Sequence, residues 1–171
     1  MKKTNVAHRV ALGSMLTALM LTLGYVESLI PLGVAIPGIK LGLSNSVLMY
    51  ALYIMGIKEA LVLMVLKVVL SGLMFGGVTA MMYSLAGAVL SMIAMILIMK
   101  VPKVSVITVS MIGAVFHNVG QVVLAMMILN TSKLLYYLAV LMVVGIFTGM
   151  LTGIVANSVM RALDKISTNH R

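Results

Sequence analysis

The fold is decided by residues 134–160, which read LLYYLAVLMVVGIFTGMLTGIVANSVM. The stretch carries no charged side chain, and it is longer than the roughly 20 apolar residues that an α-helix needs to cross a bilayer. Gly145, Gly149 and Gly153 recur at every fourth position, a spacing that lets two membrane helices approach closely. We therefore predict a membrane-spanning helix that packs through these glycines inside a bundle, with a homodimer seam or a moving contact as the alternatives.

The composition of the 171-residue chain extends this prediction to the whole molecule. Hydrophobic residues make up 63%, charged residues make up 9%, and the mean hydropathy is +1.22, whereas a soluble domain is about 45–50% apolar and about 25% charged. So few charges exclude a cytosolic enzyme, a disordered tail and a free-standing nucleic-acid-binding protein. The net charge of +9 comes from Lys and Arg residues scattered between apolar runs, as in the loops of multi-pass membrane proteins, and no nucleic acid partner is expected.

Charged turns and turns rich in Gly or Pro divide the chain into six candidate spans. Pro31 and Pro37 end the first apolar run, because proline cannot continue a helix, and Gly76-Gly77 marks another turn. We predict an all-α integral membrane protein, a six-helix bundle that forms a single transmembrane domain over residues 1–171. The expected spans are residues 8–30, 40–56, 59–76, 78–99, 104–130 and 134–160.

The basic residues are unevenly distributed between the two sides of this arrangement. If the N-terminus is cytoplasmic, nine Lys and Arg residues fall on the cytoplasmic side, and two, Lys40 and Lys133, fall outside. Cytoplasmic loops of membrane proteins carry an excess of Lys and Arg. We therefore expect both termini in the cytoplasm and a multi-pass protein of the cytoplasmic membrane.

Acidic residues and cysteines are too few for most catalytic chemistry. The chain has three acidic residues, Glu27, Glu59 and Asp164, which are far apart in the sequence, and it has no cysteine. No pair of carboxylates is placed to hold Mg²⁺ on a diphosphate, and no nucleotide-binding loop, zinc-protease motif or serine-hydrolase motif occurs. We expect no enzyme activity, no catalytic residue, no metal and no cofactor.

Polar side chains inside the expected spans mark a candidate substrate site. A charged residue within a span is costly and is a functional hypothesis by default, and Lys67 lies in the middle of the third span. Because no Asp or Glu falls at that depth, an anionic ligand is the simplest counter-ion. The alternative is that the lysine snorkels to an interface while His117 and Asn118 merely bond to neighbouring backbone. The predicted substrate-binding set is Lys67, His117, Asn118, Gln121, Lys40 and Asn45.

Small residues line one face of the first span. Ala7, Ala11, Ser14 and Ala18 follow one another at spacings of four, three and four, which places them on one side of a helix. Such a face either packs closely inside the bundle or docks against another membrane subunit. The sequence leaves both possibilities open.

Residues 36–76 resemble the membrane family known as heptaprenyl diphosphate synthase component I, also called the Gx transporter family. The resemblance is carried by Pro37-Gly38-Ile39-Lys40-Leu41-Gly42-Leu43-Ser44-Asn45, by Gly56-Ile57-Lys58-Glu59-Ala60, and by Lys67 and Ser71. In length and span pattern the resemblance covers nearly the whole chain. The family is in turn similar to the substrate-binding S components of energy-coupling factor (ECF) transporters, which are six-helix membrane proteins.

This resemblance implies a transport function. S components bind a vitamin or related small molecule from outside, and they dock through an Ala-x-x-x-Ala face of the first helix against a membrane T component that works with two cytoplasmic ATPases. Ala7 and Ala11 match that face, and Met15 stands at the next position. We therefore expect the S component of an ECF transporter for a small anionic or amphipathic molecule. The alternative is a non-catalytic membrane subunit of a prenyl (heptaprenyl) diphosphate synthase. A closed polar pocket favours transport, and an open apolar groove at the cytoplasmic face favours the synthase.

Overall fold

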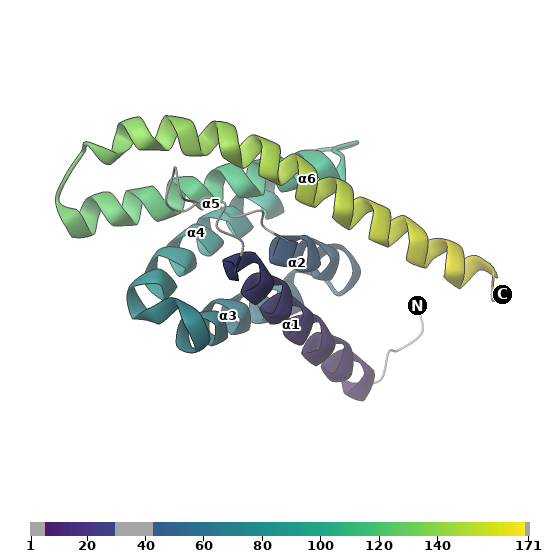
Figure 1. Cartoon of the computed structure of the whole chain (residues 1–171). Coiled ribbons are helices and arrows are strands. Elements are labelled where there is room, and N and C mark those ends of the chain that lie inside the picture. The colour runs from purple at the N-terminus through teal and green to yellow at the C-terminus, as the bar shows by residue number, and fades with distance from the viewer. Residues whose placement is uncertain (1–5, 30–42, 170–171) are drawn as a thin grey trace.

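The computed structural model describes residues 6–29 and 43–169, and this part of the chain is almost entirely helical (Figure 1). The elements are α1 (Val6–Leu29), α2 (Leu43–Ile54), α3 (Ile57–Ser71), a π-helical turn η1 (Gly72–Gly76), α4 (Gly77–Ile98), α5 (Val106–Leu129) and α6 (Leu134–Asn169). No strand occurs in these two ranges. The predicted all-α class is confirmed for these residues, and the six expected spans stay predictions.

The helices end where the sequence predicts turns, and the backbone explains why. Gly56 separates α2 from α3 with a φ of +102°, and Gly77 lies between η1 and α4 with a φ of +73°. Asn130 closes α5 in the left-handed conformation, with a φ of +47°. Left-handed backbone is tolerated best by Gly and also by Asn. Ser105 begins α5 by accepting a hydrogen bond from the N–H of Thr108 at 3.1 Å.

The helices form two groups. α4, α5 and α6 pack in chain order, while α1, α2 and α3 each contact the other two (Figure 1). The groups are joined where α2 packs on α6 and where α3 packs on α4. The turn between α5 and α6 lies at one end of the molecule, and the later part of α6 extends to the opposite end (Figure 1).

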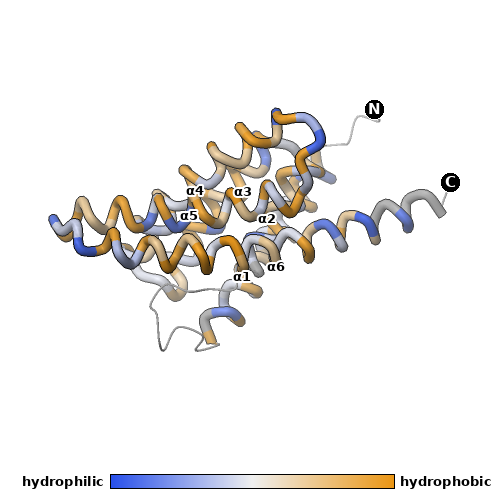
Figure 2. The backbone as a smooth tube through the Cα atoms, turned by 90° about the horizontal axis from the view of Figure 1, so that it is seen from above, coloured by the Kyte–Doolittle hydropathy of each residue, from blue (hydrophilic) through white to orange (hydrophobic). Residues whose placement is uncertain are grey.

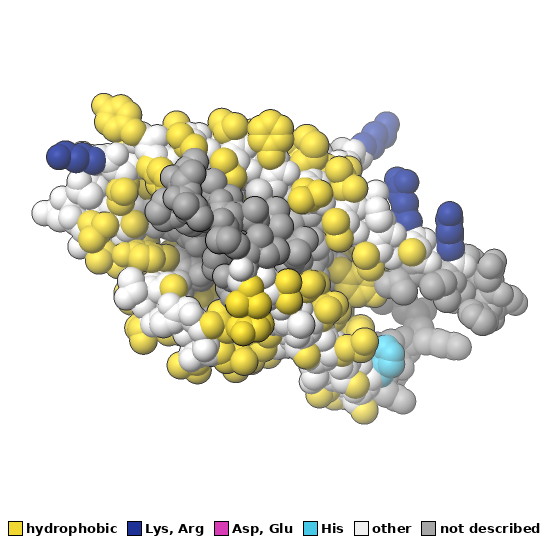
Figure 3. Space-filling model, viewed as in Figure 1, with side chains coloured by type: hydrophobic (Ala, Val, Ile, Leu, Met, Phe, Trp, Pro, Cys, Tyr) yellow, Lys and Arg dark blue, Asp and Glu magenta, His cyan; other side chains and the backbone are white. Residues whose placement is uncertain are grey.

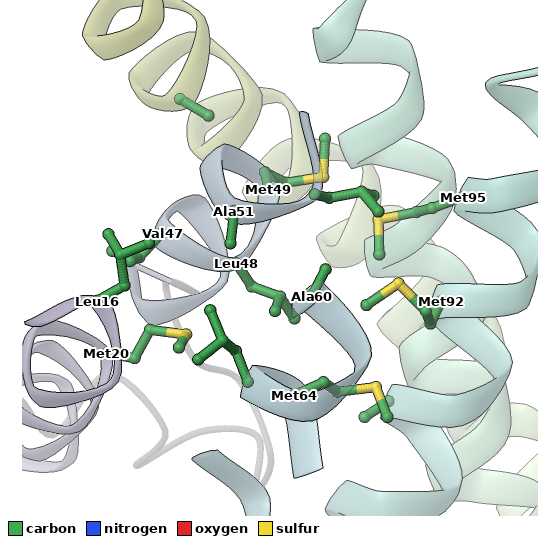
Figure 4. Close-up of a cluster of buried hydrophobic side chains, with 14 of the residues drawn as sticks. Leu16, Met20, Val47, Leu48, Met49, Ala51, Ala60, Met64, Met92 and Met95 are labelled. Carbon is green, nitrogen blue, oxygen red and sulfur yellow. The ribbon is translucent and has the colours of Figure 1, made fainter. Parts of the chain in front are cut away.

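The hydrophobic core lies where the two groups meet. Met20 of α1, Leu48 of α2 and Met64 of α3 are buried there together with Met92 and Met95 of α4 (Figure 4). Methionine is unbranched and flexible, and it fills irregular gaps between packed helices. The two groups are therefore joined through flexible side chains.

Four stretches of the described chain are long and apolar enough to cross a membrane: Val6–Glu27, Ile57–Ile98, Val106–Leu129 and Leu134–Ala162. Apolar residues follow the helices, and polar residues gather at turns and helix ends (Figure 2). On the face seen in Figure 3 the surface is largely hydrophobic, with Lys and Arg side chains at its extremes. This distribution is typical of an integral membrane protein. The number of crossings and the side of the termini stay predictions.

Candidate functional site

The candidate site centres on Lys67. This residue of α3 is partly buried, and its Nζ donates a hydrogen bond to Oδ1 of Asn45 in α2. Hydrogen bonds with an ionised partner are stronger than neutral ones, and this bond joins two helices at a place where an ammonium group is costly. The structure thus brings two of the predicted substrate-binding residues into contact.

The first turn of α2 adds polar groups on both sides of Asn45. Ser44 and Ser46 are each 5% exposed. Among the described residues, Oγ of Ser46 is a buried oxygen with no hydrogen-bond partner. Leaving a buried polar group unsatisfied costs about 1–3 kcal/mol, so such an atom in a native structure calls for an explanation. We refer to the contacting pair Asn45 and Lys67, together with the two serines next to Asn45 in the sequence, Ser44 and Ser46, as the α2–α3 polar cluster; of these serines, Ser44 lies beside Gly24 of α1.

The described helix α2 is shorter than a membrane is thick. Its 12 residues rise about 18 Å, whereas the hydrocarbon core is about 30 Å thick. Its last residues lie at the Gly56 turn, and α3 begins there with Glu59 paired to Arg9 of α1. If this charged pair lies at the membrane surface, the first turn of α2 falls at mid-depth. The N–H groups of a helix's first turn carry partial positive charge, which adds to the charge of Lys67.

A π-helical turn follows α3 shortly after Lys67. Gly72, its first residue, is buried so closely that an added Cβ would lie 2.7 Å from Cβ of Met81 in α4. Phe75 packs on Tyr25 of α1, with ring centroids 5.9 Å apart. Turns of this kind are frequent at functional sites. Here the π-helical turn holds the end of the lysine-bearing helix between α1 and α4.

The three predicted residues of α5 have other neighbours. A Cβ added at Gly87 of α4 would lie 2.6 Å from the carbonyl oxygen of His117 and 2.9 Å from Cγ of Gln121, so both residues lie at the α4–α5 contact. Asn118 instead faces α6, where its Nδ2 donates to the carbonyl oxygen of Leu141 at 2.7 Å. The lysine-bearing α3 packs on α1, α2 and α4. A shared site for these α5 residues and the α2–α3 polar cluster stays a prediction.

The three glycines of α6 are buried against α5. A Cβ added at Gly149 would lie 2.6 Å from Cα of Met111, and one at Gly153 would lie 2.8 Å from Cα of Ile107. Gly145 lies beside Asn118, whose Nδ2 would be 2.9 Å from its added Cβ. Helix backbones that approach this closely leave no room for a side chain. The glycine stripe therefore faces a helix of the same chain.

The small-residue face of α1 has a different environment. Ala7, Ala11, Ser14 and Ala18 are all exposed, whereas the core residues of α1 lie on another side of the helix. This face is therefore not covered by the described helices of the chain. Its docking to another subunit stays a prediction. Lys40, the remaining predicted site residue, lies outside the described residues.

Two polar features of the interior were not predicted from the sequence. One is Ser46. The other is a hydrogen bond of 2.8 Å between the hydroxyls of Ser110 in α5 and Thr152 in α6, both buried. Ser and Thr in apolar helices often bond to their own backbone, so residue type alone does not show which hydroxyl faces a neighbour. For Thr152 the available signal was Gly149, which lies three residues earlier and therefore on the same side of α6.

An open apolar groove runs along the seam between α4 and α5. It consists of two hollows, of about 390 Å³ and about 300 Å³, that share Leu90. One end lies at Val101, between the exposed Lys100 and Lys103. No residue that lines it carries a polar side chain. The first hollow is lined by Leu90, Ile93, Ala94, Leu97, Ile98, Val101, Ile112 and Phe116, and the second by Ala86, Val89, Leu90, Gly120, Val123, Leu124 and Met127.

Comparison with known families assigns the chain to one of them. A family model described as heptaprenyl diphosphate synthase component I matches residues 16–159. The chain belongs to this family. Neither a curated protein nor a solved structure matches the chain. The match to the component I family spans the α2–α3 polar cluster and the α4–α5 groove, and it begins after Ala7, Ala11 and Ser14 of the α1 face.

The component I family is named after a synthase, but the described residues of this chain do not assemble a metal-dependent active site. No group of three or more His, Cys, Asp or Glu side chains among them could hold a metal ion. Glu27 is buried in α1, and Glu59 pairs with Arg9 at the start of α3. The description of the family as a synthase component implies a partner chain in a synthase complex.

Proposed function

We propose that this component I protein is the substrate-binding membrane component of an ECF-type transporter, taking up a small anionic or amphipathic molecule while ATPases on other chains supply the energy. The observation that carries the proposal is the α2–α3 polar cluster. In it, Lys67 and Asn45 pair inside an apolar bundle, and the residue after Asn45, Ser46, has a buried hydroxyl with no hydrogen-bond partner among the described residues.

The chemistry of the cluster suits an anion. An ammonium group, serine hydroxyls and the N–H groups of a helix's first turn are all hydrogen-bond donors, and carboxylate and phosphate oxygens accept from each of them. In secondary transporters, short helices that start at mid-membrane point their N-termini at anionic substrate groups. With the Arg9–Glu59 pair at the membrane surface, the first turn of α2 would take this role in the present chain.

A six-crossing topology with both termini in the cytoplasm is part of the proposal. The stretch Ile57–Ile98 then crosses twice, because Gly77 interrupts it with a positive φ and α3 packs against α4. In this cysteine-free chain, an impermeant thiol reagent added to whole cells is expected to label Ser132→Cys and to leave Val101→Cys unlabelled. Equal labelling of these two exposed positions would contradict the topology.

The exposed face of α1 is the proposed contact with the membrane T component of the transporter. Replacing Ala11 by Leu adds bulk where two helices would approach closely, so co-purification of the T component and its ATPases is expected to fall. Ala139→Leu, on an exposed position of α6, is the matched control and leaves the complex intact. Equal recovery with both variants would place the contact elsewhere.

Native mass spectrometry of the purified protein tests substrate binding. We expect a co-purified small molecule on the wild-type protein and on Lys133→Met, a control in the exposed α5–α6 turn, and its loss from Lys67→Met. An apolar residue suits the bilayer interior, so Lys67→Met is expected to fold. A folded Lys67→Met protein that retains the molecule would overturn the proposal.

A second candidate function is that of a non-catalytic membrane subunit of a prenyl diphosphate synthase. The description of the component I family and the open apolar groove between α4 and α5 favour it. Affinity purification from native membranes separates the two functions. A T component with its ATPases supports transport, whereas a chain with the paired acidic motifs of a prenyl transferase supports the synthase.

A further inference from the structure

The turn between α4 and α5 carries two lysines without a counter-ion in the described chain. Lys100 and Lys103 are both exposed, and neither ammonium group makes a hydrogen bond or an ion pair with another described residue. Arg9 of α1, in contrast, pairs with Glu59 of α3. The two positive charges of the α4–α5 turn are therefore available to an anion from outside the chain.

The backbone at Lys103 gives a second reason to assign a role to its charge. Its φ of +64° lies in the left-handed region, which Gly adopts freely and which Asn tolerates better than most other residues do. The other left-handed residue of the described chain that is not a glycine is Asn130. Backbone strain of this kind is concentrated at binding and switch sites. A glycine at this position would relieve the strain, but it would lack the positive charge.

α5 begins in the same turn and adds to its positive charge. Its N-cap residue is Ser105, whose hydroxyl accepts a hydrogen bond from the N–H of Thr108. The N–H groups of the helix's first turn carry partial positive charge, and both hydroxyl-bearing residues are exposed. Phosphate oxygens accept hydrogen bonds from lysine, from hydroxyls and from the N-terminus of a helix. Residues 100–108 therefore present groups that suit a phosphate.

The first hollow of the α4–α5 groove opens at this turn. Its lining includes Val101, which stands between the two lysines in the sequence, and reaches Leu90 on α4 and Phe116 on α5. From position 90 to position 101 a helix rises about 16 Å, which is close to the half of the roughly 30 Å hydrocarbon core that one leaflet supplies. The lining residues of the second hollow have no charged neighbour in the sequence. The hollow with the basic mouth thus has the length of one acyl chain.

We propose that residues 100–108 and the first hollow form a site for a phospholipid with an anionic headgroup. The phosphate lies against Lys100 and Lys103, and one acyl chain follows the α4–α5 seam as far as Leu90. The second hollow takes acyl chains of the opposite leaflet without a preference for their headgroups. This inference goes beyond both candidate functions, because it uses no residue of the α2–α3 polar cluster and needs no partner subunit.

Native mass spectrometry of the full chain in detergent measures the headgroup preference. The probes are dioleoyl phosphatidylglycerol and dioleoyl phosphatidylcholine, which share their acyl chains and differ in net charge. Two basic side chains near an anionic headgroup correspond to about thirtyfold tighter binding of phosphatidylglycerol. Inorganic phosphate is expected not to displace this lipid. Equal binding of the two lipids, or displacement by inorganic phosphate, would overturn the inference.

Two double variants that remove the same charge locate the headgroup. Lys100→Gln/Lys103→Asn removes both lysines of the turn and places at position 103 a residue that tolerates the φ of +64°. We expect this variant to bind the two lipids alike. Lys58→Gln/Lys133→Gln removes two exposed lysines elsewhere in the chain, and it is expected to keep the preference. If the two double variants behave alike, the preference arises from net charge and the proposed site is wrong.

A photoreactive phosphatidylglycerol locates the acyl chain. With a diazirine at the end of one chain and the protein in phosphatidylcholine nanodiscs, peptide mass spectrometry is expected to find the label near Leu90 and Phe116. Ile93→Trp, at a half-exposed position of the first hollow, is expected to weaken labelling, whereas Val143→Trp, at an exposed position of α6, leaves it unchanged. Even labelling of α4, α5 and α6, or equal labelling of these two variants, would overturn the inference.

The variant Lys67→Met separates this inference from the transport proposal. It is expected to bind and label with phosphatidylglycerol like the wild-type protein, because α3 contributes nothing to the lining of the first hollow. Retention of the co-purified molecule by Lys67→Met would overturn transport and leave the lipid site in place. Loss of the phosphatidylglycerol preference from folded Lys67→Met would overturn the lipid site.

Discussion

The α4–α6 half of the molecule is joined by backbone contacts, whereas the α1–α3 half is joined by side chains. In the first half, a Cβ added at Gly120 would lie 2.7 Å from the carbonyl oxygen of Ala86. In the second half, the nearest atoms to a Cβ at Gly13 and at Gly24 are 3.6 Å and 3.9 Å away. Backbones in contact fix the distance between two helices, whereas packed side chains can change rotamer. The comparison identifies a rigid scaffold and an adjustable half.

Polar groups differ between the two halves in the same way. In α4–α6, the hydroxyls of Ser110 and Thr152 bond to each other, and Asn118 bonds to a carbonyl of α6. In α1–α3, Lys67 bonds to Asn45, whereas the hydroxyl of Ser46, the next residue of α2, has no such partner within the described chain. Satisfied buried networks fix a structure, and an unsatisfied buried group is a place for a ligand. We therefore propose that ligand binding takes place in the adjustable half.

The largest expected effect on stability concerns the bond between α2 and α3. Asn45→Leu removes the acceptor of a charged donor, and we expect it to lower the free energy of unfolding by about 1.5–3 kcal/mol. Adding Lys67→Met to this variant is expected to recover most of the loss. Thermal unfolding in detergent measures both. If the double variant is no more stable than Asn45→Leu, the bond does not hold the adjustable half together.

Glycine substitutions test the packing difference itself. Gly149→Ala places a Cβ 2.6 Å from Cα of Met111, and we expect this overpacking to cost about 1–3 kcal/mol. Gly13→Ala has room at 3.6 Å, and it is expected to be neutral or slightly stabilising, because Ala favours helix more than Gly. The melting temperatures of the two variants measure this difference in stability. Equal losses of stability would show that the two halves are packed equally closely.

A smaller effect is expected at Asn118. Asn118→Leu deletes the hydrogen bond to the carbonyl of Leu141, and interhelical hydrogen bonds in membranes average about 0.6 kcal/mol. We expect a stability loss of this size with binding of the co-purified molecule retained, since the amide is used by α6. If Asn118→Leu lost the molecule while its stability stayed unchanged, Asn118 would belong to the binding site.

The smallest effect is expected at the charged pair between α1 and α3. Arg9 and Glu59 have side chains that are 46% and 26% exposed, and solvent screens such pairs to about 0.2–1 kcal/mol. A double-mutant cycle with Arg9→Gln and Glu59→Gln is expected to give a coupling energy at the low end of this range, and the coupling should weaken in high salt. A coupling energy of several kcal/mol would show that this ion pair holds α1 and α3 firmly together.

The helices were predictable from the sequence because their ends carry unambiguous signals. Gly56, Gly77 and Asn130 stand where the chain needs a positive φ, and proline and charge mark the turn between α4 and α5. The shortness of α2 follows from the distance between its turns. The predicted number of crossings rests on hydropathy and charge, and the helices alone do not test it.

The neighbours of each polar side chain were harder to predict. His117 and Asn118 are adjacent in the sequence, yet one lies at α4 and the other at α6, because successive residues on a helix point about 100° apart. The sequence does not state which helix lies on which side. The contact between Lys67 and Asn45 joins residues from two helices whose relative depth is fixed by tertiary packing, and Ser46 carries no signal that separates it from other serines.

Two serines of equal burial give the most direct test of the central claim that the adjustable half holds an open polar site. Ser46 and Ser110 are each 5% exposed, and the chain has no native cysteine. Cysteine reacts as the thiolate, which requires a wetted environment. We expect a small methanethiosulfonate reagent to modify Ser46→Cys in nanodiscs and to leave Ser110→Cys intact, with both modified after unfolding in detergent. A native Ser110→Cys protein that reacts as fast as Ser46→Cys, or a native Ser46→Cys protein that does not react, would contradict the account.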